Sequence, residues 1–422
     1  MVEHPSVAQA TRVWWRIGVL SFGGPAAQIA LMHKEIVEKR QWLSEAQFLN
    51  ALSFCMLLPG PEAMQLATYA GWRLHGTLGG LIAGLLFVFP GAVVIMVLAF
   101  IYSVFGDVPL VSALFYGIKA AVLVIVFEAL LRVSKKALTK KMHWLIAAFA
   151  FVGIFFLSIP YPIIVLSAGL LGWIVTSENQ TQDNDKTIHV SVRDFLSTAI
   201  IWLAIWWLPL LALAMFGAPA LLISIGNFFS TLAVVTFGGA YAVLAYMAQD
   251  VVVQFGWLDA GEMIDALGLA ETTPGPLILV TQFVGFLSGF KQDGLYLGVA
   301  AALVAIWSTF VPCFLWIFAG APYIDWISNQ PRLKGALQAI TAAVVGVILN
   351  LSIWFALHVL FLRVQRESVG VITLWTPDIS SIEWLAVALF LFSCFLAFRL
   401  RWGIARILLV AALLGAALKL LL

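Results

Sequence analysis

Two long stretches without charge constrain the fold of this chain more than any other feature. Residues Thr77–Gly106 and Gly294–Ile324 contain no Asp, Glu, Lys or Arg. A helix needs about 20 apolar residues to cross a hydrocarbon core of about 30 Å, so each stretch is long enough for one tilted span. Hydrophobic residues make up 63% of the chain and charged residues 10%, against roughly 45–50% and about 25% in soluble domains. We therefore predict an all-α polytopic membrane protein, because the strands of a β-barrel alternate in polarity over only about ten residues.

Other apolar stretches predict further helices. They are Leu110–Leu131, His143–Leu157, Tyr161–Thr176, Phe195–Phe216, Gly335–Leu362, Trp384–Phe398 and Gly403–Leu422. Several are only about 15 residues long, which favours tightly turned hairpins over independent spans. The net charge of +2 offers no basic face for nucleic acid. The three cysteines and six histidines lack the spacing of metal ligands, so we expect neither a metal site nor another cofactor.

The two halves of the chain repeat each other. A shift of 215 residues superposes Phe22-Gly23-Gly24 on Phe237-Gly238-Gly239, Trp42-Leu43 on Trp257-Leu258, and Pro59-Gly60-Pro61 on Pro274-Gly275-Pro276. After a net insertion, the correspondence continues with Pro90 and Pro312, Pro109 and Pro331, and Ala120-Ala121 and Ala342-Ala343. The most polar stretch, Ser177–Asp194, lies between the halves. We predict a first membrane repeat over residues 1–176, a polar linker over 177–194 and a second membrane repeat over 195–422.

Corresponding loops of the two repeats carry opposite charge bias. The loop His33–Glu45 holds three Lys or Arg residues, and its counterpart Ala248–Ala260 holds none. The next pair reverses, since Gly106–Pro109 has no cation and Gln330–Lys334 has two. Because Lys and Arg in short loops are retained on the inner side of a membrane, this exchange predicts repeats of inverted topology.

Each repeat is interrupted twice, at Phe-Gly-Gly and at Pro-Gly-Pro, and we predict broken helices there. In secondary transporters such interruptions, at matching positions of inverted repeats, line the substrate site near the membrane midplane. A helix start displays unpaired amides and the positive end of the helix dipole, which suits an anion. Pro25 and Pro61 suit the first turn of a new helix, and Gly60 is expected to expose an amide between two prolines. Glycine and proline also serve as ordinary kinks in membrane helices, but the duplication of both motifs favours function.

The predicted substrate-binding residues at these breaks lie in both repeats. They are Phe22, Gly23, Gly24, Pro25, Pro59, Gly60, Pro61, Glu62, Gln65, Gly238, Gly239, Thr272, Thr273, Pro274, Gly275 and Pro276. The two threonines offer hydroxyl groups to a substrate, or bond back to their own helix as threonines in membrane helices commonly do.

Two ionisable residues, Lys119 and Glu128, lie inside an apolar segment. Such residues are functional candidates because burying an unpaired charge is expensive. Their repeat counterparts are the uncharged Thr341 and Asn350. We predict that Lys119 attracts an anion. Glu128 would carry a proton or, as the favoured alternative, pair with Arg132 one turn later near the membrane surface.

A dense polar cluster follows the first break. A solvated turn explains the cluster most simply, and His33 and Arg40 are the members that we predict to support the site.

These residues resemble the chromate ion transporter (CHR) family in its long, two-domain form. The resemblance rests on FGGP…HKEIVEKRQWL…LPGPEAMQLATYAGWRLHG and on the weaker echo TFGGAYAVLAYM…GWL…ETTPGP, and it covers both halves. It implies a multi-pass transporter of the bacterial inner membrane that exports chromate, a dianion similar to sulfate, and confers chromate resistance. The family signature falls on Phe22-Gly23-Gly24-Pro25, Trp42, Pro59-Gly60-Pro61 and Gly71. In the second half Ala240 replaces the proline and the loop cations are missing, so we do not expect equal roles for the halves.

Two other readings stay open. The cargo could be sulfate, another oxyanion or a small organic anion, because a family does not fix its substrate. A membrane-embedded enzyme would need a convergent constellation of catalytic groups, and Glu62 and His75 are too far apart in the sequence to share one helix face. We therefore expect a transporter with alternating access between the two repeats, in contact with the lipid bilayer. Self-association as a homodimer stays open, since the halves are implied to descend from single-domain proteins that work in pairs.

Overall fold

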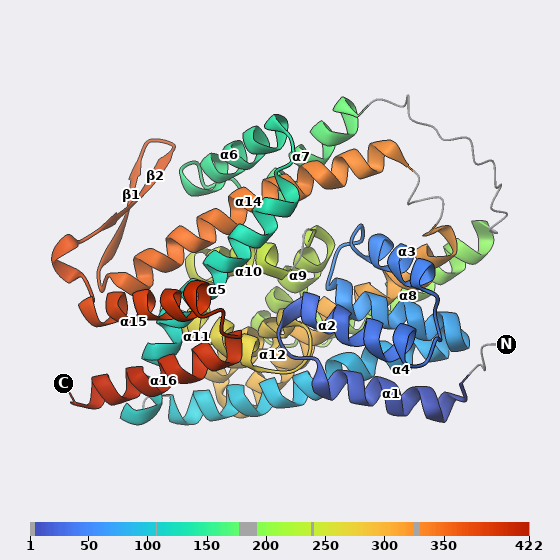
Figure 1. The fold of residues 1–422 in the computed structure, drawn as a ribbon, viewed down its shortest axis with the longest axis horizontal. Coiled ribbons are helices and arrows are strands. Elements are labelled where there is room, and N and C mark those ends of the chain that lie inside the picture. Colours follow the sequence, from blue (N-terminus) through green and yellow to red (C-terminus); the bar gives the residue numbers. More distant parts are fainter. Residues whose placement is uncertain (1–4, 107, 177–191, 238–239, 325–329, 422) are drawn as a thin grey trace. The chain divides into compact units, whose positions relative to one another are not determined.

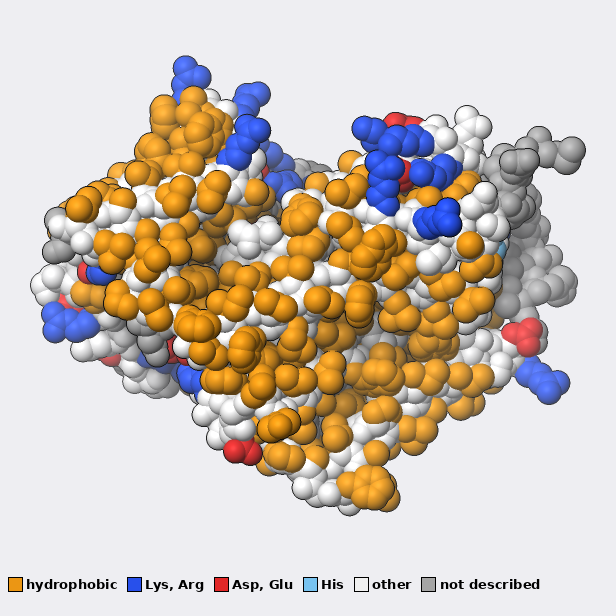
Figure 2. Space-filling model, turned by 90° about the horizontal axis from the view of Figure 1, so that it is seen from below, with side chains coloured by type: hydrophobic (Ala, Val, Ile, Leu, Met, Phe, Trp, Pro, Cys, Tyr) orange, Lys and Arg blue, Asp and Glu red, His pale blue; other side chains and the backbone are white. Residues whose placement is uncertain are grey.

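The computed structural model describes residues 5–106, 108–176, 192–237, 240–324 and 330–421. This part of the chain consists of helices and one two-stranded β-hairpin (Figure 1). Six of the described helices are long and apolar enough to cross a membrane. Hydrophobic side chains cover most of the face shown in Figure 2, with Lys and Arg gathered toward its margins. The predicted class, a helical polytopic membrane protein, is confirmed. Gly238, Gly239 and residues 177–191 of the predicted linker lie outside the described residues.

The first repeat contains seven α-helices and one π-helical turn among its described residues. They are α1 (Val7–Leu20), α2 (Gly24–Met32), a π-helical turn (His33–Glu38), α3 (Glu45–Cys55), α4 (Glu62–Phe105), α5 (Pro109–Ala137), α6 (Lys141–Phe155) and α7 (Tyr161–Val175). Serines cap two of them, since the hydroxyls of Ser6 and Ser44 accept hydrogen bonds from the backbone amides of Gln9 and Gln47. These caps fix where α1 and α3 begin.

The second repeat follows the same order, preceded by one extra helix. Its described elements are α8 (Val192–Met215), α9 (Ala220–Val235), α10 (Ala240–Gln249), a π-helical turn (Asp250–Gln254), α11 (Ala260–Thr272), a 3-10 turn (Leu277–Leu279), α12 (Val280–Gly320), a 3-10 turn (Ala321–Tyr323), α14 (Pro331–Leu360), β1 (Val364–Val369), β2 (Ile372–Pro377), a 3-10 turn (Ile379–Ser381), α15 (Trp384–Cys394), a π-helical turn (Phe395–Arg399) and α16 (Ile404–Leu421). Even the π-helical turn recurs, after α2 and after α10. The duplication in the sequence is therefore a duplication in the structure.

The long elements α4 and α12 are each folded back on themselves. The backbone dihedral angles of His75 and Gly76 in α4 are not helical, and Gly76 has a φ of 60°. A Cβ atom on Gly71 would lie 2.3 Å from the carbonyl oxygen of Gly79, although eight residues of straight helix would separate them by about 12 Å. The two segments of α4 therefore pack against each other across a sharp turn, and the predicted span from Thr77 starts just beyond it.

The same turn occurs in α12 at Asp293 and Gly294, where Gly294 has a φ of 69°. A Cβ atom on Gly289 would lie 2.5 Å from the carbonyl oxygen of Leu297. Small residues thus let the two segments of each hairpin approach closely, as they do at helix contacts in membranes.

The chain forms two compact units that cut across the sequence repeats. Unit 1 contains Met1–Phe100, Thr176–Ala240 and Thr273–Lys334, and unit 2 contains Ile101–Val175, Tyr241–Thr272 and Gly335–Leu422. In unit 1, α12 packs against α8 and α9, and the indole of Trp307 donates a hydrogen bond of 3.0 Å to the carbonyl oxygen of Trp206.

In unit 2, helices of one repeat pack against helices of the other. α5 lies beside α15 and α16 (Figure 1), and a Cβ atom on Gly117 would lie 1.9 Å from the carbonyl oxygen of Ala411. Likewise, a Cβ atom on Gly346 in α14 would lie 2.1 Å from the carbonyl oxygen of Ala147 in α6. The repeats therefore exchange partners within this unit, which fixes α5 next to helices from the end of the chain.

The β-hairpin is an element that the sequence did not predict. β1 and β2 pair antiparallel with Val369 opposite Ile372, and Gly370 supplies the positive φ of the turn. The amide of Thr373 donates a hydrogen bond of 2.7 Å to the carbonyl oxygen of Phe156. That bond ties the hairpin to the end of α6.

Candidate functional site at the helix breaks

The breaks in the first repeat lie where the sequence predicts them. α1 ends at Leu20 and α2 begins at Gly24, after Gly23 with a φ of 85°. α3 ends at Cys55, and α4 begins at Glu62 directly after the Pro-Gly-Pro segment. Gly60 has a φ of 116°, which L residues rarely adopt. The predicted helix starts at both motifs are confirmed.

Two symmetric hydrogen bonds join the breaks of one repeat to those of the other within unit 1. The amide of Gly60 donates to the carbonyl oxygen of Thr236 at 2.9 Å, and the amide of Gly275 donates to that of Ser21 at 2.8 Å. Ser21 and Thr236 correspond under the 215-residue shift, as do the two glycines. The expectation that Gly60 exposes its amide is therefore wrong, because this donor binds the opposite repeat. The Pro-Gly-Pro segments hold the breaks together rather than offer these two amides to a ligand.

Each Pro-Gly-Pro segment also rests on the long helix of the other repeat. A Cβ atom on Gly91 of α4 would lie 2.1 Å from the carbonyl oxygen of Pro274. A Cβ atom on Gly60 would lie 3.1 Å from the sulfur of Cys313 in α12. Gly91 and Cys313 directly follow the matched prolines Pro90 and Pro312. The breaks thus form one cluster in unit 1, which we call the break cluster: residues 21–24, 59–61, 236–237 and 274–276.

Two buried glutamines hold the carbonyl groups of the break cluster. Gln28 donates from Nε2 to the carbonyl oxygen of Gly275 at 2.7 Å, and Gln65 donates from Nε2 to that of Pro59 at 2.7 Å. Both side chains are at most 1% exposed, and neither Oε1 atom has a donor among the described residues. Gln65 was predicted as a site residue and Gln28 was not. The signal for Gln28 in the sequence is that it is the single polar side chain in an otherwise apolar helix, one turn after Pro25.

The start of α2 presents backbone amides to open space. Within the described part of the chain, no acceptor bonds the amides of Gly24, Ala26 and Ala27, and no side chain caps this helix. Among the described residues, a Cβ atom on Gly24 would meet no other atom within 4 Å. Pro25 lies in the same first turn. A helix start with free amides and room in front of it can bind an anion through its N–H groups and its dipole.

Lys119 lies in unit 2, where a buried carboxylate balances its charge. Its Nζ atom is 3.2 Å from Oδ2 of Asp265, and the hydroxyl of Tyr102 donates to the same oxygen at 2.8 Å. Asp265 is only 3% exposed. Asp265 is not among the site residues predicted from the sequence, although an acidic residue in the mainly apolar segment before the second Pro-Gly-Pro is a visible signal. Whether Lys119 also attracts an anion stays a prediction.

Two other candidates in unit 2, Glu128 and Thr272, make the structural contacts that were the alternatives to a functional role. Arg132 donates to Oε1 of Glu128 at 2.7 Å, and both side chains are more than one-third exposed. The ion pair between residues one turn apart, which the favoured alternative predicted, is confirmed, and its position near the membrane surface stays a prediction. The hydroxyl of Thr272 donates to the carbonyl oxygen of Leu269 at 2.8 Å, which is the back-bonding of a membrane threonine.

The polar cluster after α2 is partly buried, so a fully solvated turn is the wrong description. Glu35 is only 2% exposed and binds Lys39 and Arg40. Burial alone would raise the pKa of Glu35, but hydrogen bonds from Lys39 and Arg40 lower it. His33 lies 2.7 Å from Glu45, and the hydrogen bond with that carboxylate raises the pKa of His33. Arg40 thus has a structural partner within its own loop.

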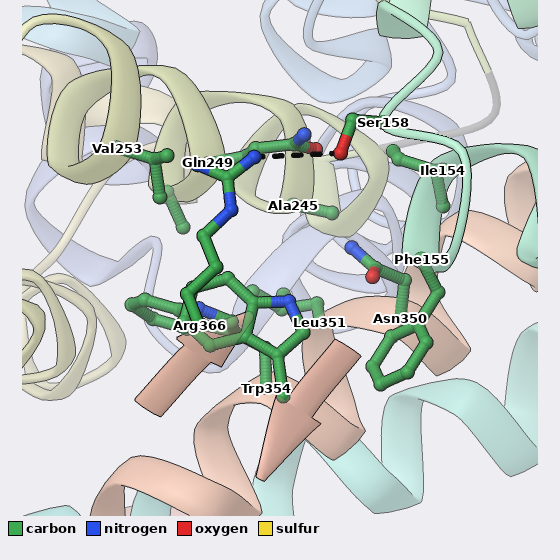
Figure 3. Close-up of a pocket in the computed structure, with 12 residues that line it drawn as sticks. Ile154, Phe155, Ser158, Ala245, Gln249, Val253, Asn350, Leu351, Trp354 and Arg366 are labelled. Carbon is green, nitrogen blue, oxygen red and sulfur yellow. Dashed lines mark hydrogen bonds between the residues drawn. The ribbon is translucent and has the colours of Figure 1, made fainter. Parts of the chain in front are cut away.

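A separate small pocket lies in unit 2, lined by the end of α6, by α10, by α14 and by the β-hairpin. Figure 3 shows Arg366 reaching toward Ser158, with the guanidinium 3.4 Å from the hydroxyl oxygen. The amide side chains of Gln249 and Asn350 also line the pocket. It contains none of the predicted site residues, so the break cluster remains the candidate site.

Comparison with known proteins agrees with this architecture. The model of the chromate transporter family matches residues 8–173 and 223–416. A probable chromate transport protein of Synechococcus elongatus is 30% identical over 348 residues, which are 82% of this chain and 84% of that relative. A chromate transport protein of Cupriavidus metallidurans is 28% identical over 344 residues, 81% of each chain.

A shorter relative matches only part of the chain. The transporter YwrB of Bacillus subtilis is 29% identical over 152 residues, which are 36% of this chain and 76% of that relative. No solved structure matches the chain. The family match covers both repeats and most of the sequence. The chain therefore belongs to the chromate transporter family, whose members are transporters and not enzymes.

Proposed function

We propose that this protein exports chromate across the bacterial inner membrane and so confers chromate resistance. The relatives that bear the name chromate transport protein align with about four-fifths of the chain. The single observation that supports an anion as cargo is the open start of α2. There the amides of Gly24, Ala26 and Ala27 lack acceptors among the described residues.

The dianion binds through helix starts more than through cations. A helix N-terminus carries about half an elementary charge and contributes up to about 2 kcal/mol in a partly buried site. Gly23 and Gly24 carry no side chain, so a tetrahedral oxyanion can approach the amides of the first turn closely. Phe22 and Pro25 flank the start of α2 and limit how the anion can reach its amides. Glu62 lies in the first turn of α4.

Transport proceeds by alternating access between two repeats of inverted topology. The hydrogen bonds from Gly60 to Thr236 and from Gly275 to Ser21 are equivalent contacts, one donated by each repeat to the other. Two equivalent contacts permit two equivalent arrangements, in which one or the other break opens. The differences between the repeats, such as Gln28 against Val243, set which side binds the anion more tightly.

The membrane potential favours export over import. Moving one charge across 100 mV is worth about 2.3 kcal/mol, so a dianion gains roughly 4–5 kcal/mol on leaving a cell with a negative interior. Import of sulfate would run uphill against this potential and would need a coupled cation. This energetic difference favours export over import for a dianion, whichever oxyanion is carried.

Uptake of tracer chromate into inside-out vesicles tests the proposal. We expect saturable flux that follows the imposed potential, with sulfate as a weaker competitor. A Gly24→Leu variant should lose this flux, because a side chain at the start of α2 would fill the space in front of the free amides. Absence of saturable chromate flux in folded wild-type protein would refute chromate as the cargo, and flux of sulfate alone would establish the alternative.

A further inference from the structure

Glu271 is a buried carboxyl group with a neutral partner. It lies in the last turn of α11 and is 7% exposed. Its Oε1 atom accepts a hydrogen bond of 2.7 Å from the hydroxyl of Tyr241 on α10. Asp265 on the same helix has Lys119 as a cationic partner. No Lys, Arg or His nitrogen of the described residues lies within 4 Å of the Glu271 carboxyl group.

The cation that acts on Glu271 from the neighbouring helix is already paired with another carboxylate. Arg132 and Glu128 of α5 are the charged groups that act on it from the neighbouring helix, and they form an ion pair with each other at 2.7 Å. Tyr241 faces it from α10 and is neutral. An isolated ionised carboxylate is very costly to bury, and such groups usually take up a proton instead. The surroundings of Glu271 therefore favour the neutral acid.

The first repeat shows that the fold does not need this carboxyl group. Under the 215-residue shift, Glu271 corresponds to Met56 and Tyr241 to Ala26. Both members of the hydrogen-bonded pair are thus additions to the second repeat alone. A structural role common to both breaks cannot explain them.

We propose that Glu271 binds one proton together with each transported dianion and releases it with the dianion on the other side. This inference rests on the proposed function. Glu271 precedes Pro274 by three residues, and three residues span at most about 11 Å. Gly275 is hydrogen-bonded to Ser21, which lies just before the start of α2. An ionised carboxylate near this segment would repel a dianion bound at that start, so dianion binding favours the protonated acid. By reciprocity the proton strengthens binding of the dianion.

The proton balance is simple. Water on the side where the site opens supplies the proton, which converts the carboxylate of Glu271 to the carboxylic acid as the dianion binds. Closure of the site buries the neutral acid beside the Tyr241 hydroxyl. When the site opens on the other side and the dianion leaves, the acid returns the proton to water there. One negative charge then crosses per cycle, so the membrane potential still drives export.

Proteoliposomes that contain a pH dye and tracer chromate test this coupling. In the wild type, the KM for chromate should rise at least tenfold between about pH 6 and about pH 8, beyond the change due to the protonation of chromate itself. In Glu271→Gln and Glu271→Met, KM should change less than threefold beyond that change. These variants should also lose the coupled proton flux. Glu367→Gln, which alters an exposed carboxylate on β1, serves as the matched control and should keep the wild-type profile.

The outcomes separate the two proposals. Chromate flux with the wild-type pH profile in Glu271→Gln would overturn the role of Glu271 and leave chromate export intact. Infrared spectroscopy tests Glu271 without any transport. We expect the C=O band of a buried, protonated carboxyl group near neutral pH, lost in Glu271→Gln and kept in Glu367→Gln. A band that Glu271→Gln leaves unchanged would refute the proposal even if the protein carried no chromate.

Discussion

Replacement of Gly91 by alanine tests whether the breaks are held by the long helix of the opposite repeat. The added methyl group would lie 2.1 Å from the carbonyl oxygen of Pro274. A carbon atom and a carbonyl oxygen normally approach no closer than about 3.3 Å, so α4 and the second Pro-Gly-Pro segment would have to separate by about 1 Å. Gly91 has helical dihedral angles, and backbone strain does not contribute.

The cost follows from what the separation disturbs. Overpacking of a close contact costs about 1–3 kcal/mol, and here the obstacle is backbone rather than a mobile side chain. The same displacement stretches the hydrogen bond from Gly275 to Ser21, which is worth about 0.5–1.5 kcal/mol. We expect Gly91→Ala to lower the free energy of unfolding by about 2–4 kcal/mol, with a fall in Tm of roughly 2–5 °C for a chain of this length.

Thermal unfolding in detergent, with chromate flux measured in parallel, provides the assay. Gly403→Ala is the matched control, because a Cβ atom there meets nothing within 4 Å and its φ is not positive. That variant should stay within about 0.5 kcal/mol of the wild type. A Gly91→Ala protein with wild-type Tm and wild-type flux would show that α4 does not rest on Pro274, and the account of the break cluster would fail.

Three further predictions concern charged groups. Lys119→Thr should cost about 3–5 kcal/mol in thermal unfolding, because it leaves the buried Asp265 unpaired; adding Asp265→Asn should recover most of that loss, and no recovery would exclude the pairing. The contact of His33 with Glu45, which raises the pKa of His33, stabilises its loop fully below about pH 6.5 and less as the pH rises through the raised value; the amide protection of residues 33–45, corrected for the intrinsic pH dependence of exchange, should follow this profile in the wild type and become independent of pH in His33→Gln. Glu128→Gln should change stability by no more than about 0.5 kcal/mol, and a larger change in Tm would mean that its ion pair is not merely a surface contact.

The class of fold and the positions of the breaks could be predicted from the sequence because both follow from local chemistry. Uncharged stretches define the spans, and glycine and proline end helices wherever they lie. The helix boundaries at Gly24 and Glu62 follow from Pro25 and Pro61 alone. The duplication added the correspondence between distant segments, such as Phe22-Gly23-Gly24 with Phe237-Gly238-Gly239.

Partnerships across the chain could not be predicted in this way. Hydropathy marks Thr77–Gly106 as a span, but the fold-back at Gly76 depends on the small residues at which the two segments of α4 meet. The pairing of Lys119 with Asp265 joins helices from different repeats, and no local pattern encodes that contact. The β-hairpin was not predicted because the predicted elements were the long apolar stretches, whereas its strands are short and β1 carries charged residues.

Hydrogen exchange of the break cluster measures the central claim most directly. On addition of chromate to the folded protein, we predict slower amide exchange in the peptide that covers residues 21–28, where the amides of Gly24, Ala26 and Ala27 would bind the dianion. The peptide that covers the β-hairpin, residues 364–377, should exchange as before. Unchanged exchange over residues 21–28 in protein that transports chromate would contradict binding at the start of α2.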